Sequence, residues 1–153
     1  MRSQVHFAVF ALFTVTAIPV CASGLDDKVP DQQSINALEA RLAQAQPREQ
    51  CFLYAELVHE MTEFSVRQYA AGDVEKSADL LRQIQGLALK IHLSVADDNK
   101  RLKNAEILLR HTAFRLNEML HSSSLGDRAL VEQTLAQVNL TQTEIMLQVF
   151  RNN

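Results

Sequence analysis

The chain has 153 residues, of which 47% are hydrophobic, 6% aromatic and 22% charged, and it contains no Trp. A formal net charge of −3 gives no basic footprint and argues against a nucleic-acid partner. Four Gly and three Pro in a sequence rich in Leu and Ala are typical of a helical protein, and the length suffices for one domain with a hydrophobic core.

The first residues have the pattern of a secretory signal peptide. Arg2 supplies a positive charge, residues 5–18 are largely apolar, and Val20-Cys21-Ala22 offers the small residues that signal peptidase prefers. We expect cleavage after Ala22, a disordered lead-in over residues 23–30, and a periplasmic or secreted protein of bacterial type. A retained membrane anchor is one alternative, although an apolar run of about 14 residues is shorter than the roughly 20 that a spanning helix needs. Lipidation of Cys21 is another, disfavoured because Val20 stands where a lipobox has Gly, Ala or Ser.

Cleavage would leave Cys51 as the one cysteine of the mature chain, which cannot form an internal disulfide. Its position at the edge of an apolar helix face predicts a small buried side chain. A reactive thiol or an intermolecular disulfide is the alternative.

One helical hairpin pattern occurs twice between residues 55 and 149. Its leading arms match at an offset of 50 positions, Ala55-Glu56-Leu57-Val58 against Ala105-Glu106-Ile107-Leu108. Its returning arms match at an offset of 54: Leu81, Ile84 and Ile91 against Leu135, Val138 and Ile145. Turns are predicted at Gly72-Asp73 and at Gly126-Asp127, the second one four residues longer because it includes residues 121–124. Gly72 is expected in the left-handed conformation, with Asp73 capping the next helix.

These patterns predict an all-α fold in a single domain over residues 31–153: a four-helix bundle built from two tandem hairpins, preceded by a short helix. Asp31 would cap the short helix, whose apolar stripe is Ile35, Leu38 and Leu42. The apolar stripe of the second hairpin arm lapses between Val95 and Leu102, which favours a turn there over one continuous helix.

Two Glu-x-x-His motifs, Glu56 to His59 and Glu118 to His121, raise the alternative of a metal-binding bundle. Two such helices and a Glu from each of two more form the ligand set of ferritin-like di-iron proteins. A helical wheel places all four side chains roughly 140–160° away from the core direction of their helices. We therefore expect them on solvated faces, and we expect no catalytic residue, metal or cofactor in the interior; a weak surface metal site is left open.

A basic and apolar stripe is predicted on the outer side of the helix near residues 100–120. It consists of Lys100, Lys103, Ile107, Arg110, His111 and Phe114. Apolar residues among cations on a face away from the core indicate a docking surface for an acidic protein or a sister subunit, and less readily for a membrane. The alternative is that the short first helix packs there. Further apolar residues off the main stripes point either to that helix or to self-association: Leu89, Leu93, Leu140 and Leu147.

Two short stretches are similar to known families. Residues 72–77 followed by Leu80-Leu81 resemble the inter-helix turn of a tetratricopeptide repeat, whose period is 34 residues. Leu140-Thr141-Gln142-Thr143-Glu144 is similar to the LTxxQ box of exported helical chaperones, with Glu in the last place. Neither resemblance covers enough of the chain to assign a family.

No motif of a P-loop, a dinucleotide site, a nucleophile elbow or covalent haem attachment occurs in the sequence. The sequence therefore favours an exported, non-enzymatic binding or scaffold protein that acts through protein–protein contacts. It does not identify the partner, the biological process or the oligomeric state.

Overall fold

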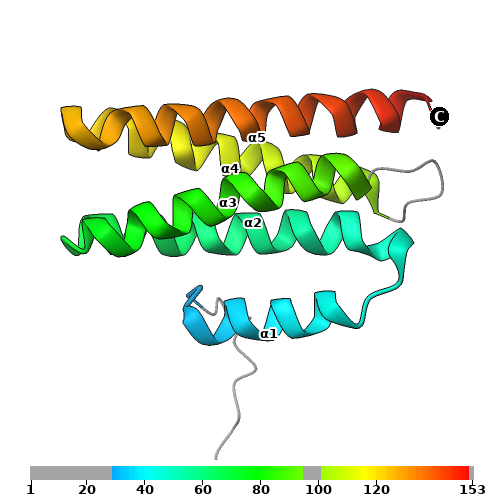
Figure 1. The fold of residues 1–153 in the computed structure, drawn as a ribbon. Helices are drawn as coiled ribbons and strands as arrows, with labels where there is room; N and C mark the ends of the chain where they lie inside the picture. The colour runs from blue at the N-terminus through cyan, green and yellow to red at the C-terminus, as the bar shows by residue number, and fades with distance from the viewer. Residues whose placement is uncertain (1–28, 95–100, 152–153) are drawn as a thin grey trace, which may run out of the picture.

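The computed structural model describes residues 29–94 and 101–151, and within these ranges every regular element is an α-helix (Figure 1). The prediction of an all-α protein is confirmed. The expected signal peptide, most of the lead-in and Lys100 lie outside the described residues. None of the described helices is long and apolar enough to cross a membrane. In chain order the helices are α1 Gln32–Ala43, α2 Pro47–Ala70, α3 Val74–Ser94, α4 Leu102–Ser122 and α5 Leu125–Arg151.

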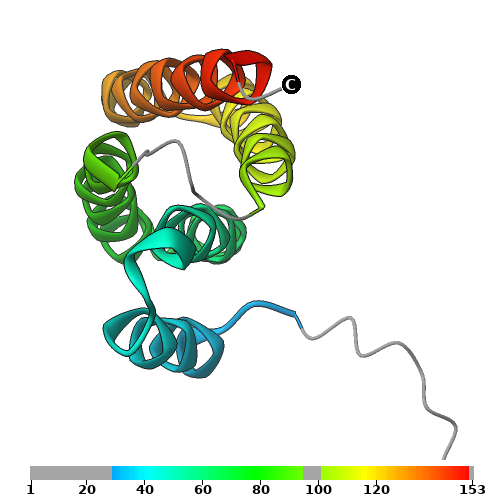
Figure 2. The same cartoon turned by 90° about the vertical axis from the view of Figure 1, so that its right-hand side faces the viewer.

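Successive helices run in opposite directions, so α2 is parallel to α4 and α3 is parallel to α5 (Figure 1). Helix α2 packs against α3 and α4, and α5 packs against the same two helices. Viewed end-on, the four therefore follow the order α2, α3, α5, α4 around the bundle, and α3 lies diagonally opposite α4 (Figure 2). The α4–α5 hairpin is stacked on the α2–α3 hairpin in the same sense, as hairpins stack in helical-repeat proteins. Because α3 and α4 are separate and opposed, one continuous helix over both is excluded.

Helix α2 is the centre of the molecule because it contacts α1, α3 and α4. Nine of its residues are consequently buried, on more sides than a simple amphipathic stripe would allow: Cys51, Phe52, Leu53, Ala55, Leu57, Val58, Met61, Thr62 and Ser65. Helix α1 buries Ile35 and Leu38, and its described contacts are with α2 alone. The alternative in which the first helix covers Ile107 and Phe114 is therefore wrong, and Phe114 is 61% exposed.

The parallel contact between α2 and α4 is made by small side chains. Ala55 and Thr62 lie one turn to either side of His59, which reaches α4, and all of Ala55, Thr62, Ala105 and Thr112 are fully buried. Each threonine hydroxyl donates to the carbonyl four residues earlier in its own helix, at 2.9 Å in both cases. Both hydroxyl protons are thus satisfied within their own helices, so these short side chains let the two backbones approach closely.

The first predicted turn is confirmed. Gly72 has φ = +88°, and the Asp73 carboxylate accepts a hydrogen bond from the backbone N–H of Lys76 at 3.1 Å, capping α3. A backbone bond from Asp73 N–H to the carbonyl of Gln68 at 2.9 Å closes the end of α2.

The second predicted turn is confirmed in part. The chain turns at Ser123 and Ser124, inside the predicted serine run, but α5 already begins at Leu125. The placement of the turn at Gly126-Asp127 is therefore wrong, and Gly126 is helical. Ser124 precedes α5 and exchanges hydrogen bonds with Asp127: its hydroxyl donates to the carboxylate at 2.7 Å and accepts from the backbone N–H at 3.3 Å. Tyr69 of α2 holds this turn in place, since its hydroxyl donates to Asp127 at 3.1 Å and accepts from the N–H of Ser124 at 2.8 Å.

The predicted apolar stripes of α3, α4 and α5 are mostly buried, with a few differences. On α4, Met119 is buried and its neighbour Leu120 is half-buried. Gln142 is half-buried and donates to Glu106 of α4 at 2.9 Å, which provides the partner that an amide in the stripe requires. Gln148, only 2% exposed, was not expected inside.

The two turn glycines offer a matched test of this geometry. Gly72→Ala forces a Cβ into the left-handed region and is expected to lower the free energy of unfolding by about 1 kcal/mol. Gly126→Ala places a Cβ within a helix, where its nearest contact would be the Ser124 hydroxyl at 3.9 Å, so it is expected to leave stability unchanged or raise it. Urea unfolding followed by circular dichroism measures both; equal losses would contradict the assigned turns.

Candidate functional site

The residues predicted to form a docking surface lie together on the outer side of α4. The α4 basic face, as we define it for the described residues, consists of Lys103, Ile107, Arg110, His111 and Phe114. Four of them are exposed and Ile107 is half-buried. Phe114, at 61% exposure, is an aromatic side chain held largely in solvent, one helical turn after Arg110 and His111 and three turns after Lys103. It offers apolar area that a partner can bury next to positive charge.

Two cations of this face form no described ion pair. In the described part of the chain no carboxylate lies within ion-pair distance of Lys103 or Arg110. Glu106, one helical turn from each of them, accepts a hydrogen bond from the neutral amide of Gln142, and Glu118 pairs with Arg115. The face therefore presents free cationic groups on a chain whose formal net charge is −3.

A hollow of about 350 Å³ lies along the boundary of α2 and α4, beside the α4 basic face. Ile107 belongs to both, so the basic face borders a recess and is not flat. The recess is lined by Phe52, Glu56, His59, Glu60, Arg101, Asn104, Ile107 and Leu108.

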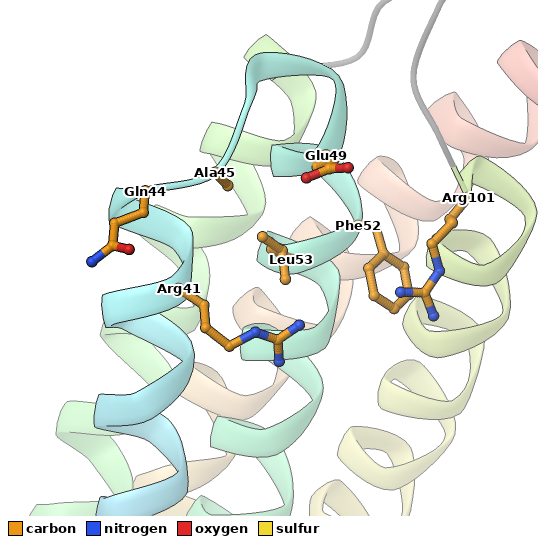
Figure 3. A pocket seen from close by; sticks show the side chains of 7 residues that line it. All are labelled: Arg41, Gln44, Ala45, Glu49, Phe52, Leu53 and Arg101. Atoms are coloured by element: carbon orange, nitrogen blue, oxygen red, sulfur yellow. The ribbon is translucent and has the colours of Figure 1, made fainter.

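A second hollow, of about 430 Å³, lies where α1 turns into α2. Figure 3 shows Arg41 extending from α1, and Arg101 standing beside α4, on either side of Phe52 and Leu53 of α2. The Arg101 guanidinium carbon is 3.5 Å from the centroid of the Phe52 ring, a cation–π contact. Phe52 and Arg101 also line the α2–α4 recess, so the two hollows meet at this stacked pair. Sequence patterns do not predict this hollow, because it is formed by residues of α1, α2 and Arg101 that only the fold brings together.

The two Glu-x-x-His motifs are each engaged in separate local contacts. Glu56 is 3.7 Å from Arg41 Nη1 of α1, and Glu118 pairs with Arg115. His121 Nδ1 is 2.6 Å from the carbonyl of Asn117 in its own helix. Within residues 29–94 and 101–151, no group of three or more His, Cys, Asp or Glu side chains is placed to hold a metal ion.

His59 differs from the expectation of a solvated side chain. It and Glu56 are half-buried, because α4 and α1 flank this side of α2. His59 Nδ1 is 3.2 Å from Thr112 Oγ1. The Thr112 hydroxyl donates its hydrogen to the carbonyl of Leu108, so it can only accept a hydrogen bond from His59. The neutral imidazole therefore carries its hydrogen on Nδ1.

Burial lowers the pKa of His59, and the nearby positive charges of His111 and Arg115 act in the same direction, against the opposing effect of Glu63. On the same side of α2, burial raises the pKa of Glu60, partly offset by a hydrogen bond from Ser34 of α1. The packing of α1 and α4 on α2 therefore shifts the pKa values of both His59 and Glu60.

Cys51 is fully buried in the core cluster. Burial raises the pKa of its thiol to about 11, so it is protonated at neutral pH. These facts favour the small buried side chain over a reactive or intermolecularly paired thiol.

Comparison with protein-family models, with curated proteins and with solved structures finds no match to this chain.

The buried neutral state of His59 predicts a pH dependence of stability. The unfolded chain takes up a proton at His59 near the ordinary pKa of about 6.5, whereas the folded protein resists protonation. Stability is thus fully present above that pKa and is lost as the pH falls toward the lower pKa of the folded state. His59→Gln should reduce the fall in melting temperature between pH 7.5 and pH 5.5, measured by circular dichroism.

The matched control is His121→Gln, because His121 is exposed at the end of α4. It should show the wild-type fall in melting temperature. An unchanged pH dependence in His59→Gln would mean that His59 is not held neutral by its surroundings.

Proposed function

We propose that this protein is a non-enzymatic binding or scaffold protein whose α4 basic face docks an acidic and partly apolar segment of a partner protein. The observation that carries the proposal is Phe114, 61% exposed on the same face of α4 as Lys103, Arg110 and His111. Lys103 and Arg110 have no described acidic partner. Aromatic and arginine side chains are the residue types that contribute most to binding energy at protein interfaces.

The chemistry of the face specifies the kind of partner. Unopposed cations favour acidic groups through electrostatic complementarity, which also speeds association. Ile107 and the adjoining recess of about 350 Å³ offer a place for an apolar side chain of the partner. An amphipathic helix with Glu or Asp beside Leu or Phe meets both requirements, in the manner of helix-in-groove recognition.

Binding is favoured over catalysis by the state of the polar residues nearby. His59 is held by Thr112, and Glu63 is bonded by Arg115 at 2.7 Å. These groups join α2 to α4, so they have a structural use that accounts for their position. We hold to the expectation that the protein needs no cofactor.

Two further interpretations of the sequence belong to the proposal. We infer that the bundle consists of two tandem copies of one hairpin with α1 added, supported by the offsets of 50 and 54 positions and by the parallel pairs α2–α4 and α3–α5. We also propose export from a bacterial cell to the periplasm or medium, supported by the signal-like sequence of residues 1–22.

The test is a photoreactive phenylalanine analogue placed at position 114 in the protein made by its native cell. We expect illumination to yield a covalent adduct with another protein, identified by mass spectrometry. Lys103→Glu together with Arg110→Glu should reduce the adduct about tenfold or more, because reversing both charges replaces attraction by repulsion. These changes should leave the melting temperature unchanged, since all three side chains are exposed.

Two controls distinguish specific binding at this surface from nonspecific crosslinking. The same analogue at Leu125, which is 90% exposed at the start of α5, should give no such adduct. Lys90→Glu on α3, an exposed charge reversal elsewhere, should not affect the adduct at 114. Absence of an adduct, an adduct insensitive to Lys103 and Arg110, or an adduct only with a second copy of this chain would each overturn the proposal.

A further inference from the structure

A second unpartnered surface lies on α3 and α5. The α3–α5 apolar face, as we define it, consists of Gly86, Leu89 and Leu93 of α3 with Leu140, Leu147 and Phe150 of α5. Its large side chains are all more than half exposed: Leu89 52%, Leu93 76%, Leu140 56%, Leu147 57% and Phe150 70%.

Contacts between the two helices make these side chains one continuous surface. The parallel helices are joined by Gln85 donating to Thr134 at 2.9 Å, and by Thr141 donating to the carbonyl of Ala88 at 3.4 Å. His92 and Glu144 lie 2.6 Å apart across the same boundary, one residue from Leu93. At this register the exposed leucines of α3 lie beside those of α5.

The spacing along each helix is that of a helix-packing seam. Exposed positions 86, 89 and 93 of α3, and 136, 140, 143, 147 and 150 of α5, alternate steps of three and four residues. This heptad-like spacing forms a straight stripe that suits packing against other helices. It is distinct from the buried stripe by which each helix packs in its own bundle.

Three ion pairs border the face. His92 pairs with Glu144, Arg82 with Asp79 at 2.7 Å, and Arg128 with Glu132 at 3.5 Å. Lys90 and Arg151 are exposed beside Leu89 and Phe150, and among the described residues neither forms an ion pair with a carboxylate. The centre of the α3–α5 apolar face is uncharged, so its complementary surface is another apolar helical face.

We propose that the α3–α5 apolar face pairs with the same face of a second copy of this chain. A two-fold axis brings an identical patch opposite each copy, so an apolar surface is complementary to itself. Five large side chains that each expose on the order of 100 Å² offer roughly 500 Å² of apolar area. A standard interface takes about 800 Å² per partner, of which somewhat more than half is apolar.

The dimer leaves the proposed partner site free. The pairs α3–α5 and α2–α4 form opposite sides of the bundle (Figure 2). Two copies joined through α3 and α5 would present their α4 basic faces outward, in opposite directions. The inference rests on residues other than those of the proposed function, so either can fail alone.

Light scattering after size-exclusion chromatography, repeated over a range of concentrations, tests the pairing. The purified protein is expected to have twice the monomer mass at tens of micromolar. Leu93→Glu together with Leu147→Glu should weaken dimerisation about tenfold or more, because two charges would be buried without partners. The melting temperature of the dilute monomer should be unaffected, since both side chains are largely exposed.

Leu125→Glu and Phe114→Glu are the matched controls, because both replace an exposed apolar side chain outside the face. Both should remain dimeric. A wild-type protein that is monomeric throughout, a dimer that survives the double substitution, or a dimer dissociated by Phe114→Glu would each overturn the pairing.

Discussion

The structure depends on a close parallel contact between α2 and α4. Hairpins stacked in the same sense must bring equivalent helices side by side, and the closeness of that contact depends on the size of the side chains between them. Ala55, Thr62, Ala105 and Thr112 keep those side chains small, and both threonines satisfy their hydroxyls within their own helices. Polar contacts at the edge of the same boundary, His59 with Thr112 and Glu63 with Arg115, then fix the register.

This stacking determines where the surfaces lie. With α2 beside α4 and α3 beside α5, the outer sides of the two parallel pairs point in opposite directions (Figure 2). One side has an exposed aromatic residue on the same face as Lys103 and Arg110, next to a recess. The other is apolar, and three ion pairs border it. We propose different occupants for these two surfaces, an acidic partner for α4 and a second copy for α3 and α5, and a protein with both would be a bivalent scaffold.

Much of the fold could be predicted because it follows from local rules. The 3.6-residue period located the helices, and the Gly72-Asp73 pair predicted both the left-handed residue and the cap. The turn at Gly126 was misplaced because Ser124, Asp127 and the distant Tyr69 determine it together, and sequence spacing does not reveal a contact across 55 positions. The stripe of Ile35 and Leu38 predicted that α1 packs, but not on which helix. His59 was misjudged for a related reason: a wheel drawn from one core direction cannot represent a helix with three neighbours.

The central claim is that two opposite faces of one bundle have different occupants. Hydroxyl-radical footprinting of the purified protein at increasing concentration, read residue by residue with mass spectrometry, tests it directly. The account predicts that oxidation of Leu93, Leu147 and Phe150 falls as the concentration rises, while oxidation of Phe114 is unchanged until an acidic partner is added. Shielding of Phe114 by concentration alone, with Leu93 and Leu147 still accessible, would contradict it.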